Sequence, residues 1–367
     1  MGMPRRVFMS ADAVGGVWRY ALELARGFSD RGVETRIAVL GPAPGLDQLR
    51  EAAAIGGLEV TATALPLDWT ATSEAELLEC SAVLKAMALR SGADIVHLNA
   101  PALAGRDPWP IPLVVAAHSC VGTWWNAVRR EALPEDFVWR TRLTARGLHI
   151  ADCAIAPSRS FAASIEAFYG VGVRIVPVLN GTRPLSTRPV RRRHCVFTAG
   201  RLWDEGKNMA ALDRAAAHLP VPVYAAGPVE GPNRERREFR HLQLLGRLTP
   251  VEMARWYATA PVFASLSRYE PFGLTVLEAA QAGAALVLSD IATFRELWDG
   301  VAWFVPPDDY DMLASALDYL TQEPAVAAEL GAKARLRAAR YTVDRMVAAT
   351  LDVYASIPAR QQLANTG

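Results

Sequence analysis

Short apolar segments alternate with longer amphipathic segments along most of the 367-residue chain, and this alternation limits the fold more than any other feature. In the first half, the segments expected to be strands are Arg6–Ser10, Glu34–Leu40, Ile95–Leu98, Pro112–Ala117, Cys153–Ala156 and Val173–Val178. The segments with helical periodicity between them include Val17–Asp30, Ala75–Ser91 and Ser158–Tyr169. Repeated strand–helix units of this length predict a parallel sheet that is covered by helices on both faces.

The same alternation begins again in the second half. The strands expected there are Cys195–Ala199, Val221–Ala225, His241–Leu245, Val262–Leu266, Ala285–Leu288 and Ala302–Val305. The expected helices include Met209–His218, Pro250–Thr259 and Asp309–Thr321. We therefore predict an α/β protein of two Rossmann-like domains, each a doubly wound parallel sheet, with a cleft between them at the carboxyl ends of the strands.

The composition changes between the two halves. The stretch Thr182–Arg193 contains two prolines and five arginines and lacks apolar periodicity, which is typical of a linker. We predict an N-terminal domain over residues 1–183, a linker over 184–193 and a C-terminal domain over 194–340. A final amphipathic helix is expected over Tyr341–Ser356. The segment that contains it, about residues 341–358, is expected to pack back on the first domain.

Composition excludes several classes of function. The formal net charge is +1, so no overall field draws the protein to nucleic acid, and no nucleic-acid partner is expected. The four cysteines are widely spaced and form no Cys-x-x-Cys pair, which favours buried reduced thiols in a cytoplasmic protein over a zinc site or a disulfide framework. No apolar run reaches the roughly 18 residues of a membrane span, although peripheral membrane contact stays open.

The segment Glu270–Glu278, with the sequence EPFGLTVLE, carries the clearest functional signal. It follows the expected buried strand Pro261–Leu266 and leads through a glycine-containing turn into a helix over Leu274–Ala282, with Gly283 as its C-cap. Backbone N–H groups at the start of a helix favour an anion such as phosphate. The two flanking carboxylates are good acceptors for sugar and ribose hydroxyls. Together these features predict a site for a nucleotide-sugar.

Two cations follow the first strand of the second half. Arg201 lies just beyond the expected strand, and Lys207 lies six residues later, near the start of the next helix. Each charged hydrogen bond to a phosphate contributes roughly 1.5–3 kcal/mol. The alternative is that both are ordinary surface cations.

These motifs give the chain a resemblance to a known family. The sequence resembles the retaining glycosyltransferases of family 4 in the GT-B superfamily, also called glycosyl transferases group 1, over nearly its whole length. The matching positions are Gly15-Gly16, His118, Asn180-Gly181, Gly200-Arg201 with Lys207, and the two glutamates Glu270 and Glu278. The chain departs from the family where Thr182 and Arg183 follow Asn180-Gly181, so we interpret that position as a structural turn.

The resemblance implies a role for each matching residue of the second domain. Glu270 accepts hydrogen bonds from the hydroxyls of the donor sugar, and Glu278 holds the ribose. Arg201 and Lys207 stabilise the negative charge on the leaving diphosphate, which implies catalysis without a metal or another cofactor. The residues whose backbone is expected to contact the donor are Gly200, Phe272, Gly273, Leu274 and Thr275.

In the first domain, the resemblance implies that Gly15 and Gly16 let the backbone approach the donor phosphate or the acceptor, because neither has a Cβ atom. His118 follows a strand and is expected to lie near the transferred sugar, where it orients the donor if the donor phosphate takes the acceptor proton. The alternative is a structural histidine. The aromatic residues of the following segment are expected either to stack on an acceptor sugar or to form the buried side of a helical pair; they are Trp124, Trp125, Phe137 and Trp139.

We therefore expect a cytoplasmic, retaining hexosyltransferase that moves a sugar from a nucleoside-diphosphate donor to an acceptor hydroxyl. The acceptor is expected to be a carbohydrate, a lipid-linked molecule or a small molecule, and closure of the cleft is expected to exclude water. Two alternatives stay open: an epimerase or phosphorylase of similar architecture, and an inactive protein that binds sugar nucleotides. Asp309 and Asp311 are closely spaced acids, but their position at a helix start predicts a cap and not a metal site.

Overall fold

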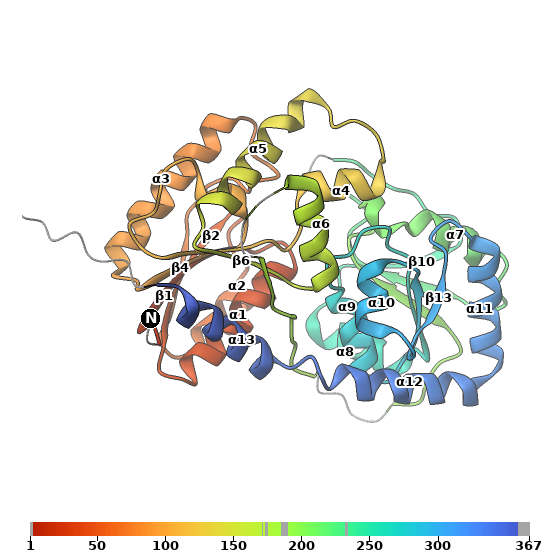
Figure 1. The fold of residues 1–367 in the computed structure, drawn as a ribbon. Coiled ribbons are helices and arrows are strands. Elements are labelled where there is room, and N and C mark those ends of the chain that lie inside the picture. Colours follow the sequence, from red (N-terminus) through yellow and green to blue (C-terminus); the bar gives the residue numbers. More distant parts are fainter. Residues whose placement is uncertain (1–2, 171, 173–174, 185–189, 232–233, 359–367) are drawn as a thin grey trace, which may run out of the picture. The chain divides into compact units, whose positions relative to one another are not determined.

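The computed structural model describes residues 3–170, 172, 175–184, 190–231 and 234–358 (Figure 1). These residues form two compact units. The first unit holds those within 1–126, 131–181 and 343–367, and the second holds those within 127–130 and 182–342. Part of the predicted linker, residues 185–189, lies outside the described residues. Among the described residues, no helix is both long enough and apolar enough to cross a membrane.

The first unit contains a seven-stranded sheet in the order β3-β2-β1-β4-β5-β6-β7, and all its strand pairs are parallel. Its strands are β1 (Arg6–Asp12), β2 (Glu34–Leu40), β3 (Leu58–Ala62), β4 (Ile95–Leu98), β5 (Leu113–Ala116), β6 (Cys153–Ala156) and β7 (Ile175–Pro177). The central strands β4, β5 and β6 are buried along their whole length, as expected for a sheet covered on both faces. Loops after these strands therefore meet at one edge of the sheet.

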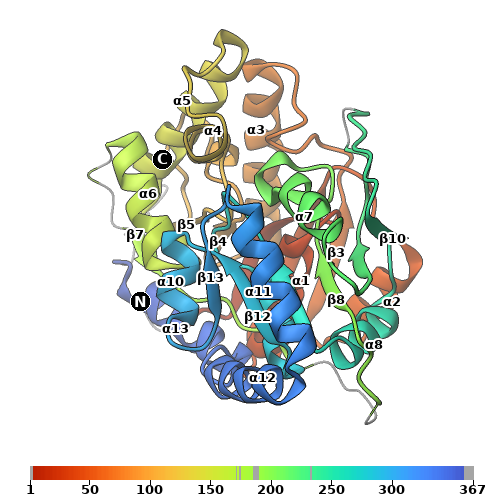
Figure 2. The same cartoon turned by 90° about the vertical axis from the view of Figure 1, so that its right-hand side faces the viewer.

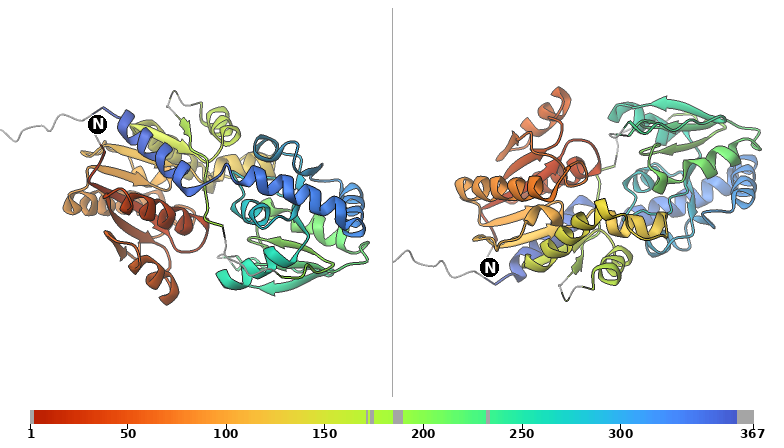
Figure 3. Two further views of the ribbon diagram at one scale, coloured as in Figure 1. Left: turned by 90° about the horizontal axis from the view of Figure 1, so that it is seen from below. Right: turned by 90° about the horizontal axis from the view of Figure 1, so that it is seen from above.

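Seven α-helices of this unit surround the sheet in the described part of the chain. They are α1 (Gly16–Ser29), α2 (Leu46–Ala53), α3 (Glu74–Ser91), α4 (Val121–Val128), α5 (Glu135–Ile150), α6 (Arg159–Tyr169) and α13 (Val343–Ser356), and a 3₁₀ turn, η1, spans Pro101–Ala104. The last helix, α13, lies along α1 (Figure 3). Gly27 makes this approach possible, since a Cβ atom there would lie 2.3 Å from Cγ2 of Val347.

The second unit contains a six-stranded parallel sheet in the order β10-β9-β8-β11-β12-β13. Its strands are β8 (Val196–Ala199), β9 (Val223–Ala226), β10 (Leu242–Gly246), β11 (Val262–Ser265), β12 (Ala285–Ser289) and β13 (Trp303–Val305). Its helices are the 3₁₀ turn η2 (Glu205–Lys207) and α7 (Met209–Ala216), α8 (Pro250–Thr259), α9 (Leu274–Gln281), α10 (Ala292–Trp298), α11 (Tyr310–Gln322) and α12 (Pro324–Ala338). Helix α11 packs against β11, β12 and β13 (Figure 2).

The two doubly wound sheets confirm the predicted fold class, and most predicted strands agree with the structure to within two residues. The sequence interpretation missed β3 and α2. Strand β3 lies at the edge of its sheet and is largely exposed, so its residues lack the continuous apolar run that marks the buried strands. Residues 173 and 174 of the strand predicted at Val173–Val178 lie outside the described residues.

Smaller predictions also agree with the structure. Asp309 is the N-cap of α11 and accepts a hydrogen bond from the backbone of Met312 at 2.9 Å, as expected for a cap. All four cysteines are buried, and none of them forms a disulfide bond. Helix α13 starts at Val343 and belongs to the first unit.

Candidate active site

Lys207 and Glu270 form an ion pair in the second unit, in which Nζ of the lysine donates to Oε2 of the glutamate. Lys207 ends the turn that follows β8, and Glu270 lies in the loop that follows β11. These strands are neighbours in the sheet, so their carboxyl ends bring together residues that are 63 positions apart. The side chains are only 16% and 11% exposed. The pair therefore lies in a mostly dehydrated place, where its charges interact more strongly than on the surface.

Backbone contacts hold the loop that carries Lys207. The carbonyl of Gly206 accepts a hydrogen bond from the backbone N–H of Arg268 at 2.8 Å, which ties this loop to the one that carries Glu270. Asn208 adopts the left-handed conformation, with φ of 54°, and its Nδ2 donates to the carbonyl of Pro307 at 2.7 Å. The two members of the ion pair are thus fixed by main-chain contacts as well as by each other.

Helix α9 begins directly after the Glu270 loop. Its N-cap, Gly273, has φ of +91° and makes no side-chain cap hydrogen bond. The first N–H groups of a helix have no partner within the helix, so they are available to an anion. A Cβ atom at Gly273 would lie 3.4 Å from Cγ of Glu270 and 3.1 Å from the ring of Phe294. The helix start and the ion pair are therefore adjacent.

The other predicted residues of this unit occupy different positions. Arg201 is half exposed and pairs with Asp204, with 2.9 Å between Nη2 and Oδ2. The aliphatic part of Lys207 passes over Gly200, where a Cβ atom would meet its Cε at 3.8 Å. The remaining residues predicted to bind the sugar donor lie on α9 or just before it. Leu274 and Thr275 are partly exposed, whereas Glu278 and Phe272 are buried. Because the ring of Phe272 belongs to the hydrophobic core, only its backbone can contact a ligand.

In the first unit, Gly15 precedes α1 and is exposed. The carboxylate of Asp12 accepts hydrogen bonds from the backbone N–H groups of Val14 at 2.9 Å and Gly15 at 3.2 Å, which shapes the turn. Gly15 has φ of −152°, and a Cβ atom there would meet nothing within 4 Å. The fold itself does not require glycine at this position. Gly16, the first residue of α1, is also exposed.

We predict that Gly15→Ala leaves the free energy of unfolding within about 0.5 kcal/mol of the wild type, because the added methyl group meets open space. Turnover is expected to fall at least tenfold if a ligand approaches this backbone. Urea denaturation and steady-state kinetics measure the two effects separately. Full activity in the variant would show that no ligand needs this space.

His118 follows β5 and is partly exposed. Its Nε2 lies 2.7 Å from Oδ1 of Asn99, while Nδ2 of Asn99 donates to the carbonyl of Ser10 at 2.5 Å. Because Nδ2 of Asn99 donates to Ser10, the amide atom of Asn99 that faces His118 is Oδ1. This oxygen can only accept a hydrogen bond, so Nε2 of His118 must carry the hydrogen. Desolvation lowers the pKa of His118 to about 4. The imidazole is therefore neutral at neutral pH, and Nδ1 has a lone pair that can accept a hydrogen bond.

A second histidine, His97 on β4, lies in the interior of the first unit and is fully buried. Desolvation, and then the neighbouring His118, lower its pKa to about 3. In the unfolded chain His97 binds a proton near pH 6.5, whereas in the folded protein it does so only near pH 3. Stability from this residue is therefore complete above pH 6.5 and falls as the pH is lowered towards 3.

We predict that His97 alone lowers the free energy of unfolding by about 2 kcal/mol between pH 7.5 and pH 5. The measurement compares urea denaturation of the wild type and His97→Gln at the two pH values, because His118 and other groups titrate in both proteins. The variant should lose less stability on acidification than the wild type. Equal losses would contradict a neutral, buried His97.

Several residues of this region were missed by the sequence interpretation. Asn99 and Ser10 orient His118, and Asp68 is a carboxyl group whose pKa is raised to about 6, first by desolvation and then by the charge of Asp12. Asn99 directly follows β4, so its position at a strand end was the available signal. Asp68 lies in a loop, and the sequence pattern does not reveal its environment.

The aromatic segment after His118 forms α4 and α5. The rings of Trp125 and Phe137 are 5.5 Å apart, and the guanidinium of Arg140 lies 4.4 Å from the ring of Trp139. Their partly exposed rings are compatible with either prediction made for them, an acceptor surface or a packed helical pair.

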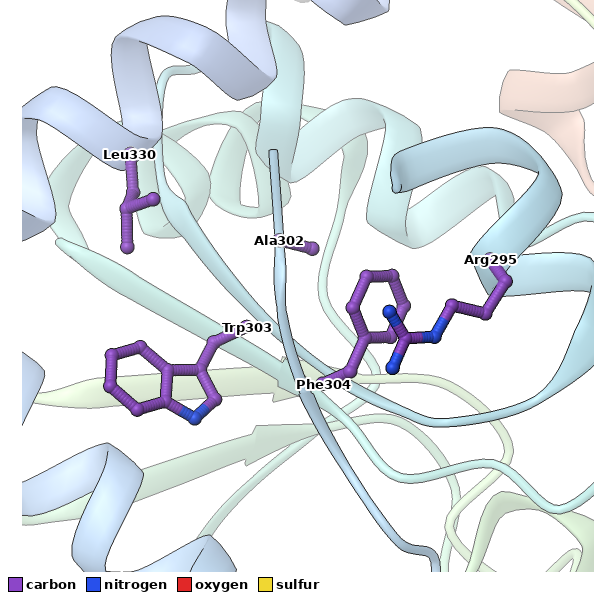
Figure 4. A pocket seen from close by; sticks show the side chains of 5 residues that line it. All are labelled: Arg295, Ala302, Trp303, Phe304 and Leu330. Carbon is purple, nitrogen blue, oxygen red and sulfur yellow. The ribbon is translucent and has the colours of Figure 1, made fainter. Parts of the chain in front are cut away.

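Two further features of the described residues concern a metal site and a cavity. No group of three or more histidine, cysteine, aspartate or glutamate side chains could hold a metal ion there. A cavity of about 310 Å³ lies beside β13, where it is lined by Arg295, Ala302, Trp303, Phe304 and Leu330 (Figure 4). None of the predicted site residues lines this cavity.

Comparisons with known proteins identify the family of this chain. Residues 14–184 match the family model for Glycosyltransferase Family 4, and residues 193–323 match that for Glycosyl transferases group 1, so the two together span most of the chain. The phosphatidyl-myo-inositol mannosyltransferase of Mycolicibacterium smegmatis is 28% identical over 95% of this chain and 92% of its own. A D-inositol 3-phosphate glycosyltransferase of Xylanimonas cellulosilytica is also 28% identical, over 95% of this chain and 93% of its own.

Solved structures show the same fold at lower identity. Sucrose-phosphate synthase from Thermosynechococcus elongatus superposes with a TM-score of 0.77 at 19% identity, over 96% of this chain and 98% of that one. Anabaena HepE, solved with UDP and glucose, gives a TM-score of 0.70 at 18% identity, over 96% of this chain and all of that one. The chain therefore belongs to the family 4 glycosyltransferases, with two parallel-sheet domains of the GT-B type.

Proposed function

We propose that this glycosyltransferase transfers a hexose from a nucleoside-diphosphate sugar to an acceptor hydroxyl, with retention of the anomeric configuration and without a metal ion. One observation carries the proposal: the dehydrated ion pair of Lys207 and Glu270 lies beside the uncapped start of α9. A cation and free amide groups suit a pyrophosphate, and a carboxylate suits the hydroxyls of a sugar. The GT-B relatives support this interpretation.

Donor binding exchanges partners within the site. Within the site, the charges of Lys207 and Glu270 neutralise each other. A pyrophosphate competes for the ammonium group and is also bound by the first amide groups of α9, including that of Thr275. The carboxylate of Glu270 is then released to accept hydrogen bonds from the sugar. Glu278, one turn further along α9, accepts hydrogen bonds from the ribose.

The chemical step breaks the bond between the anomeric carbon and the pyrophosphate oxygen. A new bond forms between the same carbon and the acceptor oxygen, on the same face of the sugar. The acceptor proton passes to the departing phosphate oxygen, so no protein base is required. Lys207 and Arg201 stabilise the charge that develops on the leaving group, and preorganised charge of this kind is commonly the largest catalytic contribution.

In the first unit, His118 orients the transferred sugar, because its neutral Nδ1 can accept a hydrogen bond from a sugar hydroxyl. Gly15 and Gly16 provide backbone that a ligand can approach closely. The acceptor belongs to the polyols, among which carbohydrates, lipid-linked molecules and small molecules are candidates. The names of the relatives make inositol-type acceptors the first to test.

The test starts with donor binding. UDP-, GDP- and ADP-sugars are added to the wild type and to Lys207→Ala, and the shift in melting temperature is measured in EDTA. The sugar nucleotide with one of these three nucleotide bases is expected to raise the melting temperature of the wild type. The shift should be much smaller in Lys207→Ala. Turnover is then measured with each acceptor class, and the anomeric configuration of the product is read by NMR. Equal stabilisation of both proteins, or an inverted product, would refute the proposal.

A further inference from the structure

The interior of the first unit contains a chain of polar side chains that the proposed reaction does not use. This polar chain consists of Tyr20 on α1, His97 on β4 and Tyr354 on α13, and all three are buried. Polar groups in a protein interior are costly unless each finds a hydrogen-bond partner. Each of these three side chains finds its partner within the polar chain.

His97 links the two tyrosines. Its Nδ1 atom lies 2.6 Å from the hydroxyl of Tyr354, and its Nε2 atom lies 3.4 Å from the hydroxyl of Tyr20. A neutral imidazole has one N–H group and one lone pair, so His97 donates one of these hydrogen bonds and accepts the other.

The polar chain runs from α13 through β4 to α1. Desolvation lowers the pKa of His97 to about 3 and raises the pKa of Tyr20 and of Tyr354, so all three are neutral at physiological pH.

Tyr20 connects the polar chain to the candidate active site. Its ring packs edge-on against the ring of His118, with centroids 4.4 Å apart and planes at 67°. The hydrogen bond between His118 and Asn99 anchors one ring atom and still allows the ring to turn about that bond. Contact with a second, rigid ring removes this freedom. The orientation of His118 therefore depends on where Tyr20 is held.

We infer that Tyr20 is a positioning residue for His118, and that α13 holds Tyr20 in place through His97, which bonds to Tyr354 on α13 and to Tyr20. The inference rests on the proposed function, in which His118 orients the transferred sugar. Because the hydroxyl of Tyr20 bonds to protein groups, its removal should affect the chemical step and not the binding of the donor. The C-terminal helix thereby contributes to catalysis without contacting a substrate.

Two substitutions test this inference. Tyr20→Phe keeps the ring but removes the hydroxyl that bonds to Nε2 of His97, and Tyr354→Phe removes the hydroxyl that bonds to Nδ1 of His97. Each is expected to lower kcat about tenfold and to change the KM for the donor less than twofold. With only six histidines in the chain, ¹⁵N-histidine NMR can follow His97 and His118 individually. His118 should carry its hydrogen on Nε2 in the wild type, and Tyr354→Phe should shift its ring signals.

Val347→Ala is the matched control. Val347 is also a buried residue of α13 and packs on Gly27, but it is not part of the polar chain. It is expected to lower the melting temperature as much as Tyr354→Phe does and to keep kcat within twofold of the wild type.

Three results would overturn the inference. If Tyr20→Phe and Tyr354→Phe keep kcat within twofold while His118→Ala abolishes turnover, only the positioning role fails. If His118→Ala itself keeps full turnover, both the positioning role and the proposed role of His118 fail. A loss of kcat in Val347→Ala equal to that in Tyr354→Phe would show that stability, not position, matters.

Discussion

Lys207→Met is expected to lower kcat about 100- to 1000-fold while the protein stays folded, because a preorganised charge at the leaving group has effects of that size. The substitution also leaves the carboxylate of Glu270 without its lysine partner in a site where it is 11% exposed. Removing one member of such a pair destabilises a protein by about 3 kcal/mol. Steady-state kinetics and urea denaturation measure the two losses.

The double variant Lys207→Met/Glu270→Gln separates the two effects. Two neutral side chains of similar size should recover most of the lost stability, while turnover should remain as low as in the single variant. Lys333→Ala is the control for a lysine of the same unit, because its pair with Glu329 is exposed to solvent and contributes little to stability. Turnover in the double variant close to that of the wild type would exclude Lys207 from catalysis.

Gly227→Ala is expected to destabilise the protein by about 3 kcal/mol or more and to lower turnover. Gly227 follows β9 with φ of +135°, a conformation that residues with a Cβ atom rarely adopt. A Cβ atom there would lie 1.8 Å from the carbonyl oxygen of Gly200. The backbone at Gly200 would have to move, and the aliphatic part of Lys207 lies over that residue. Denaturation with urea and kinetics at saturating donor measure both losses.

Gly246→Ala distinguishes this clash from simple backbone strain. Gly246 also has a positive φ, of +68°, but a Cβ atom there would meet nothing within 4 Å. We expect a cost of only about 1 kcal/mol and little change in kcat. If Gly227→Ala were no more harmful than Gly246→Ala, the close approach to Gly200 would not constrain the site.

Local pattern explains why most of the fold could be predicted. Buried parallel strands such as β4 and β6 are continuous apolar runs, and their bounds were predicted to the residue. Caps such as Ser158 and Asp309 depend on neighbours within four residues, so they too are visible in the sequence. Strand β3 was missed because its burial comes only from pairing with β2 at the edge of the sheet.

The functional residues show a similar division. Position after a strand marked Arg201 and His118 as candidates, because parallel strands deliver their following loops to one edge. Lys207 was marked by its place near the next helix start, and Glu270 by the strand–turn–helix pattern of its segment. The roles of these residues came from family resemblance and remain predictions. Neither source indicated that Lys207 and Glu270 form an ion pair with each other.

The sequence by itself determined the strand–helix order, the two-sheet architecture and the residues that follow each strand, because these depend on periodicity and on near neighbours. Only the tertiary structure decided which side chains meet. Lys207 and Glu270 are 63 residues apart, and His97 and Tyr354 are 257 apart. Such pairs form because strands β8 and β11 are neighbours and because α13 packs on α1. The free energy that joins these elements comes from burial over many residues, and no short segment of sequence records it.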